Sequence, residues 1–115
     1  MNPFALKYQL ERQTRPFRRA EVQTLPRDRI GVYALWLPAG DVPECLYIGI
    51  STTCVRRRLL DHLSNETNPE LRRQLYMFGG SVRFSAAFTD TADRTRQLEA
   101  TLISDWQPSC NILHR

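Results

Sequence analysis

The sequence predicts one α+β domain in which helices flank a small, largely antiparallel sheet. Two apolar runs, GVYALWL at 31–37 and CLYIGI at 45–50, have the composition of strands. The connector between them contains Pro38 and Pro43 and is expected to be a loop. The segment SVRFSAAF at 81–88 alternates as a third strand would. A length of 115 residues suits a single domain.

The N-terminal part of the chain has the weakest pattern. Residues 1–15 are expected to be irregular and partly mobile. The segment PFRRAEVQTL at 16–25 is expected to form a short helix, because Pro16 suits a first helical position and Pro26 would stop the helix.

Three further helices are each preceded by residues that favour helix N-caps. Asn68 is a favoured cap and Pro69 a favoured first residue, while Gly79 and Gly80 are typical of a helix end. These helices are expected over about 54–65 after Ser51, Thr52 and Thr53, over 68–78, and from Asp90 or Thr91 to about Trp106. The predicted order of elements after the first short helix is therefore ββααβα.

Charge and cysteine content narrow the class of protein. The net charge is +4, the isoelectric point is near 9.3, and Lys7 is the only lysine. Because arginine suits bidentate phosphate contacts, this excess of arginine leaves nucleic-acid binding and a solvated basic surface as equal alternatives.

No run approaches the roughly 20 apolar residues of a membrane span, and the charged N-terminus is unlike a signal peptide. The three cysteines lack C-x-x-C spacing, which predicts reduced thiols in a cytoplasmic protein.

Two tyrosines occupy similar places in the first two strands. By strand alternation, Tyr47 shares a face with Gly49, whereas Leu46, Ile48 and Ile50 share the other face and are expected in the core. In an antiparallel pair, Tyr33 would lie opposite Tyr47 or diagonal to it, so the two phenols and the glycine would line a shallow cleft. The alternative is that both are ordinary strand aromatics, and periodicity by itself favours this alternative.

A carboxylate stands where the last helix should be apolar. At about 100° per residue, Glu99 falls in the middle of an apolar arc that contains Leu98, Leu102, Ile103 and Trp106. Burial of an unpaired charge is costly, so Glu99 needs an arginine, a hydrogen-bond network or a cation. A structural Glu–Arg pair and a cation site both satisfy this need.

Three arginines follow the second strand in the segment STTCVRRRLLDHL. Its apolar residues, Val55, Leu59, Leu60 and Leu63, form the inward arc of a helix. On that helix Arg57 points toward solvent, whereas Arg58 and His62 lie together at one edge of the arc. Either the arginines form a solvated basic face, or an arginine at the edge reaches into the cleft.

Together these motifs resemble the GIY-YIG endonuclease superfamily. The chain has GVY at 31–33 and YIG at 47–49, followed in order by RRRLLDH, LEATLI and QPSCN. Val32 stands where the family has isoleucine. The resemblance covers about 30–115, which predicts a nuclease domain over 30–115 and an N-terminal extension over 1–29. It implies the fold of this superfamily, a small three-stranded antiparallel sheet flanked by helices.

The resemblance implies phosphodiester hydrolysis with one divalent ion. Glu99 would hold Mg²⁺ or Mn²⁺, Tyr33 would take a proton from the attacking water, and Tyr47 would orient the water or the phosphate. The metal and a nearby catalytic arginine would favour the phenolate form of Tyr33. Supporting residues would be Gly31, Gly49 and Asn111.

The position of the catalytic arginine has two readings. Counting from the YIG tripeptide favours Arg57, whereas the pattern of apolar residues and arginines along the helix favours Arg58. We take Arg58 as catalytic and Arg57 as a phosphate-binding residue. His62 is assigned to phosphate binding as well, with an ordinary helix-surface histidine as the alternative.

The implied partner is nucleic acid, with DNA favoured over RNA. The alternatives are a module that binds nucleic acid or protein without cutting, and a nuclease subunit that needs a protein partner or a dimer. The cluster Arg12, Arg15, Arg18 and Arg19 predicts an arm that binds phosphates in a salt-sensitive way, unless the segment packs on the sheet as structure.

Overall fold

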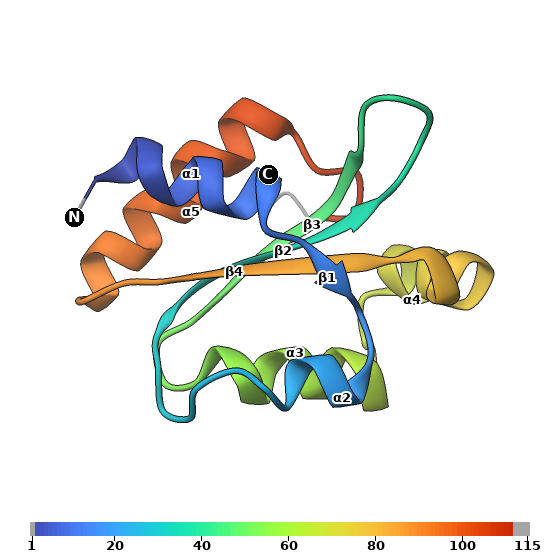
Figure 1. The fold of residues 1–115 in the computed structure, drawn as a ribbon, viewed down its shortest axis with the longest axis horizontal. Coiled ribbons are helices and arrows are strands. Elements are labelled where there is room, and N and C mark those ends of the chain that lie inside the picture. The colour runs from blue at the N-terminus through green and yellow to red at the C-terminus, as the bar shows by residue number, and fades with distance from the viewer. Residues whose placement is uncertain (1, 112–115) are drawn as a thin grey trace.

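A four-stranded antiparallel sheet in the order β1-β4-β2-β3 organises the fold (Figure 1). The computed structural model describes residues 2–111. The strands are β1 (Arg15–Pro16), β2 (Gly31–Leu37), β3 (Glu44–Ser51) and β4 (Arg83–Phe88). The helices are α1 (Pro3–Arg12), α2 (Arg19–Val22), α3 (Val55–Ser64), α4 (Pro69–Phe78) and α5 (Ala92–Trp106), with a short 3₁₀ turn at Gly79–Ser81.

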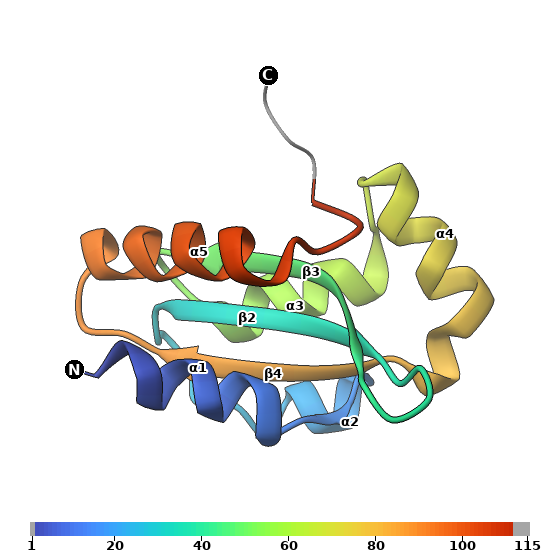
Figure 2. The same ribbon diagram turned by 90° about the horizontal axis from the view of Figure 1, so that it is seen from above.

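Helices cover both faces of the sheet. Figures 1 and 2 show α1 and α5 on one face, where α1 runs along β4 and α5 along β3, and α2 and α3 on the other face. One core therefore contains Leu10, Leu98 and Leu102, and the other contains Val22, Leu59 and residues around them. The α+β class with an antiparallel sheet and flanking helices is confirmed.

The sheet has four strands, so the prediction of three is wrong. The fourth is β1, in which Arg15 pairs with Phe84 and Pro16 with Arg83 at the edge of the sheet. Two residues are too few to produce an alternating pattern, and Pro16 was read as a helix start. Proline is tolerated here because an edge strand leaves one side of its backbone unpaired.

The expectation that residues 1–15 are irregular is also wrong. The Asn2 side chain caps α1 by accepting a hydrogen bond from the backbone N–H of Phe4 at 2.9 Å. Leu10 is completely buried on the sheet. The segment is packed structure rather than a free arm, and phosphate binding by its arginines stays a prediction.

Replacement of Leu10 by alanine is therefore expected to destabilise the protein by about 2–5 kcal/mol, the usual cost of such a core truncation. Urea unfolding would measure the change, with Phe4→Ala as the control because Phe4 is 83% exposed on the same helix. Equal stability of the two variants would contradict the packing of α1.

The β2–β3 pair contains a bulge that changes the predicted faces. The register shifts between Leu35, which pairs with Tyr47, and Trp36, which pairs with Cys45. Leu46 is therefore an extra residue and packs in the core under α3, whereas Ile48 packs in the core under α5. The prediction that Leu46 and Ile48 share a face is wrong for this reason.

The predicted helix positions after β3 are confirmed within a few residues. Asn68 caps α4 and Thr91 caps α5 through their side chains, while Cys54 takes this place for α3. After α4 the chain continues into the 3₁₀ turn at Gly79 instead of reversing in a left-handed cap. Across residues 2–111, none of the helices has the length and apolar character needed to cross a membrane.

Candidate active site

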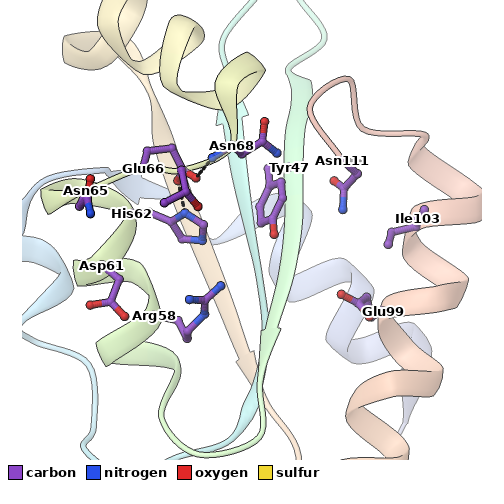
Figure 3. A pocket seen from close by; sticks show the side chains of 11 residues that line it. Tyr47, Arg58, Asp61, His62, Asn65, Glu66, Asn68, Glu99, Ile103 and Asn111 are labelled. Carbon is purple, nitrogen blue, oxygen red and sulfur yellow. Dashed lines mark hydrogen bonds and ion pairs between the residues drawn. The ribbon is translucent and has the colours of Figure 1, made fainter. Parts of the chain in front are cut away.

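A cavity of ≈ 480 Å³ opens between β3, α3 and α5, close to the loop that leads into α4 (Figure 3). Its walls are mostly polar and come from segments far apart in the sequence. The lining residues are Tyr47, Arg58, Asp61, His62, Asn65, Glu66, Thr67, Asn68, Glu99, Ile103 and Asn111. Five residues that the sequence analysis assigned to the site are thus brought together: Tyr47, Arg58, His62, Glu99 and Asn111.

Asn111 pairs with the free edge of β3 where this strand borders the cavity. Its side-chain oxygen accepts a hydrogen bond from the backbone N–H of Ile48 at 2.9 Å, and its side-chain nitrogen donates to the Ile48 carbonyl at 2.8 Å. β3 is an edge strand, so this amide pairs backbone groups that the sheet leaves free. The contact holds the segment after α5 beside Tyr47.

Tyr33 lies behind the cavity rather than along it. Tyr33 pairs with Gly49, so the phenols of Tyr33 and Tyr47 are diagonal neighbours, with ring centroids 6.3 Å apart. A Cβ atom on Gly49 would lie 2.3 Å from the Tyr33 hydroxyl oxygen, which explains the need for glycine. Tyr33 is completely buried, and Tyr47 is the phenol that lines the cavity.

Gly31 serves the sheet rather than the cavity. A Cβ atom at this position would lie 2.2 Å from the carbonyl oxygen of Ala87 in β4. Glycine therefore permits the close approach of β2 and β4, and its effect on the cavity is indirect.

A chain of hydrogen bonds connects Tyr33 to Glu66 through His62. The Tyr33 hydroxyl lies 2.7 Å from His62 Nε2, and His62 Nδ1 is paired with Glu66 Oε2. The side chains of His62 and Glu66 are 7% and 6% exposed. His62 is therefore a buried, fully partnered histidine, which does not fit the alternative of an ordinary helix-surface residue. Its assignment to phosphate binding stays a prediction.

Glu66 is a site residue that the sequence analysis missed. Its spacing of four residues from His62 is that of helical neighbours. However, α3 ends at Ser64, and the NET segment that follows at 65–67 has the composition of a loop. The position of this carboxylate depends on how the loop folds back over the helix end.

Burial dominates the acidity of both phenols. It raises the pKa of Tyr33 well above its ordinary value of 10.0, and the negative charge that Tyr47 would carry raises it further, whereas the nearby Arg58 charge lowers it. Burial likewise raises the pKa of Tyr47, again with Arg58 opposing the shift. The expected effect of Arg58 on the phenolate is present, but desolvation outweighs it.

The two candidate arginines have different surroundings. Arg58 lines the cavity on the side that faces Tyr47 (Figure 3). The Arg57 side chain is 78% exposed, and its Nε lies 3.6 Å from Asp61 Oδ1. Arg58 is therefore the arginine that lines the cavity, and its catalytic role stays a prediction.

Glu99 enters the cavity from α5, across from Tyr47 and Arg58 (Figure 3). Burial raises its pKa, and the salt bridges among residues 2–111 do not include it. Within the same residues no group of three or more histidine, cysteine or acidic side chains could hold a metal. A single half-buried carboxylate suits Mg²⁺, which keeps most of its ligands as water and substrate phosphate.

Comparison with known proteins identifies the fold. No protein-family model matches the chain, and no curated protein matches it. Among solved structures, the GIY-YIG N-terminal endonuclease domain of UvrC from Thermotoga maritima, bound to magnesium as its catalytic divalent cation, has a TM-score of 0.57 and 22% identity. That alignment covers 80% of this chain and 97% of the domain.

A point mutant of the same domain, with a tyrosine replaced by phenylalanine and the catalytic divalent cation bound, has a TM-score of 0.59 at 21% identity. It covers 81% of this chain and 97% of that domain. The protein therefore has the fold of a GIY-YIG endonuclease domain, the superfamily that its sequence motifs resemble.

Proposed function

We propose that the protein is a metal-dependent endonuclease that hydrolyses phosphodiester bonds in nucleic acid, with DNA favoured over RNA. The observation that carries this proposal is the cavity, where Tyr47, Arg58 and the carboxylate of Glu99 converge from three different elements. Within residues 2–111 no salt bridge includes Glu99. The similar UvrC domain, which binds a catalytic divalent cation, supports the same activity. The proposed nuclease domain is 30–115, with residues 2–29 packed against it.

Glu99 would hold the divalent cation, Mg²⁺ or Mn²⁺, at the α5 wall. When bound, this ion supplies Lewis acidity and positive charge to the phosphate. Arg58 would contact the same phosphate from α3 and neutralise the charge that builds up as the bond breaks. Arg57, which is exposed on the outer face of α3, would contribute to binding of the nucleic-acid backbone.

Tyr33 and Tyr47 would have different roles toward the attacking water. Tyr47 at the cavity wall would orient the water or the phosphate. Tyr33 has a proton acceptor on the protein, His62 Nε2, so it can pass its own proton to His62 as it takes one from the water. This role requires contact between the Tyr33 hydroxyl and the cavity, which movement of the exposed Arg58 side chain onto the phosphate would provide.

In this scheme water attacks phosphorus directly, so no covalent intermediate with the protein forms. The water oxygen forms the new bond to phosphorus, and its proton goes to Tyr33. The bond from phosphorus to the leaving sugar oxygen breaks, and that oxygen takes a proton from solvent. His62 returns the proton that it received from Tyr33 to solvent, which restores the site. Because Tyr33 gives up one proton as it receives another, the raised pKa of its phenol does not prevent this role.

Tyr33→Phe is expected to lower the single-turnover cleavage rate by about 10²–10⁴, the contribution of a positioned acid–base group. The ring still fills its place beside Gly49, so the melting temperature should change little. Tyr76→Phe is the matched control, since Tyr76 is 91% exposed on α4. A larger rate loss in Tyr47→Phe than in Tyr33→Phe would indicate instead that Tyr47 takes the proton and Tyr33 orients the water or the phosphate.

The activity itself is tested with a panel of labelled single-stranded, duplex and branched DNA, together with RNA. The expected result is cleavage with Mg²⁺ that stops when EDTA is added. Binding to a substrate without cleavage of any of them would instead favour a non-cutting module. Cleavage that appears only after addition of a partner protein or on dimerisation would favour a nuclease subunit.

The proposed location is the cytoplasm. This part of the proposal rests on the free thiols of Cys45, Cys54 and Cys110.

A further inference from the structure

We infer that Glu66 is a positioning residue that holds the proton of His62 on Nδ1, so that Nε2 faces Tyr33 as a hydrogen-bond acceptor. The role of this contact in cleavage rests on the proposed function, in which Tyr33 passes a proton to His62. The tautomer itself is a property of the folded protein and can be measured without a substrate.

Each oxygen of the Glu66 carboxylate has its own partner. Oε2 is paired with His62 Nδ1, and Oε1 accepts a hydrogen bond from the backbone N–H of Asn68 at 2.9 Å (Figure 3). An ionised carboxylate only accepts hydrogen bonds, so Nδ1 must be the donor. In the neutral imidazole this leaves Nε2 without a proton, and the Tyr33 hydroxyl, 2.7 Å away, becomes the donor to it.

The rings around His62 hold it in one orientation. Tyr33 from β2 and Tyr47 from β3 both contact it edge-on, with ring centroids 5.5 Å and 5.3 Å from that of His62. Arg58 lies one turn earlier on the same helix, and Glu66 is the carboxylate paired with the ring. A ring flip that exchanged the two nitrogens would break the contacts with Tyr33 and Glu66 together.

The loop after α3 keeps Glu66 in place. The backbone N–H of Asn65 closes the helix on the Asp61 carbonyl at 2.9 Å, and the chain then turns so that Glu66 returns over His62. Asn68, which holds Oε1 through its backbone, also caps α4 and donates its side-chain N–H to the Cys110 carbonyl at 2.6 Å. A buried carboxylate is costly unless it is partnered, and this arrangement partners both oxygens.

Glu66→Gln tests the inference because glutamine has nearly the same shape but only one accepting oxygen. The Asn68 N–H requires an acceptor, so the amide oxygen takes the place of Oε1. The amide nitrogen then faces His62 and donates to Nδ1. This contact favours the tautomer with the proton on Nε2, which would present an N–H to Tyr33 in place of an acceptor.

The tautomer would be read from the ¹⁵N shifts and ring couplings of labelled histidine across the neutral and mildly alkaline range. The chain has two histidines, so His114→Gln assigns the signals of His62. The expected result is Nδ1–H in the wild type and Nε2–H in Glu66→Gln. The variant should also cleave at least about 100-fold more slowly in single turnover, with a similar melting temperature.

Glu70→Gln is the matched control, because Glu70 is a partly exposed carboxylate at the start of α4 and pairs with Arg73. It should change neither the His62 tautomer nor the cleavage rate. A wild-type His62 with a proton on Nε2 would overturn the inference, and this measurement decides it even if Glu66→Gln does not fold. A folded Glu66→Gln protein that keeps Nδ1–H would overturn it as well.

Failure of the proposed function has a different signature. If the wild type cleaves no substrate in the panel, the nuclease proposal fails, while the spectrum still decides whether Glu66 sets the tautomer. A change of tautomer with full cleavage would show that the Tyr33–His62 contact does not serve the reaction, which overturns the catalytic part of the inference.

Discussion

Glu99→Gln is expected to abolish metal-dependent cleavage and leave the fold intact. The amide keeps the size of the side chain but removes the negative charge that would hold the cation, and Glu99 is the only proposed metal ligand from the protein. Cleavage and thermal melting would be measured on the same preparation. Asp93→Asn is the matched control, because Asp93 is an exposed acidic residue on the same helix. Near-normal cleavage by a folded Glu99→Gln protein would rule out this metal site.

The difference in stability between the wild type and Glu99→Gln should depend on pH in a defined direction. Burial raises the pKa of Glu99 in the folded protein above its value of 4.5 in the unfolded chain, so the folded state holds this proton more tightly. Its contribution to stability is therefore present below pH 4.5 and is lost as the pH rises through the folded-state pKa. Relative to the wild type, Glu99→Gln should gain stability as the pH rises through this window.

Added Mg²⁺ should stabilise the wild type but not Glu99→Gln. A cation that binds the folded state raises its melting temperature by mass action. The wild type should therefore show a rise with Mg²⁺ concentration that Glu99→Gln lacks. Equal shifts in both proteins would place the cation elsewhere.

Arg58→Ala is expected to lower the single-turnover cleavage rate at saturating DNA by at least about 100-fold, the scale lost with one donor to a transition-state charge. Arg58 lines the cavity beside Tyr47, where it would face the phosphate. Arg57→Ala is the matched control on the adjacent residue. It should mainly weaken binding and reduce the slope of log K against log salt by about one.

A conservative variant separates charge from geometry at this position. Arg58→Lys keeps the positive charge but cannot form the paired contacts of a guanidinium, so its rate should lie between those of the wild type and Arg58→Ala. If Arg57→Ala loses the rate and Arg58→Ala loses only affinity, the residue count from YIG was the better guide to the catalytic arginine.

The strand and helix positions after residue 30 were predictable because their boundaries are local. The run 31–37 ends at Pro38, and the structure places β2 over the same residues. Asn68 and Thr91 could be recognised as caps because the preference acts within one turn of the helix. The diagonal relation of Tyr33 and Tyr47 also followed, as one of two allowed placements in an antiparallel pair.

The N-terminal elements were not predictable in the same way. β1 exists because Arg15 and Pro16 pair with the edge of β4. α1 is stabilised by the burial of Leu10 on the sheet face that α5 also covers. Neither contact leaves a periodic pattern that is strong enough to read locally. The bulge that moves Leu46 to the other face likewise arises from pairing between strands.

By itself, the sequence determined the fold class, the order of elements after residue 30 and the candidate groups Tyr47, Arg58 and Glu99, which the cavity brings together. Only the tertiary structure decided that Tyr33 is buried and that Glu66 is paired with His62. Backbone preferences and periodicity act over a few residues and can be read along the chain. Burial and hydrogen-bond partners depend on which distant segments pack together, so the surroundings of each titratable group appear only in the folded protein.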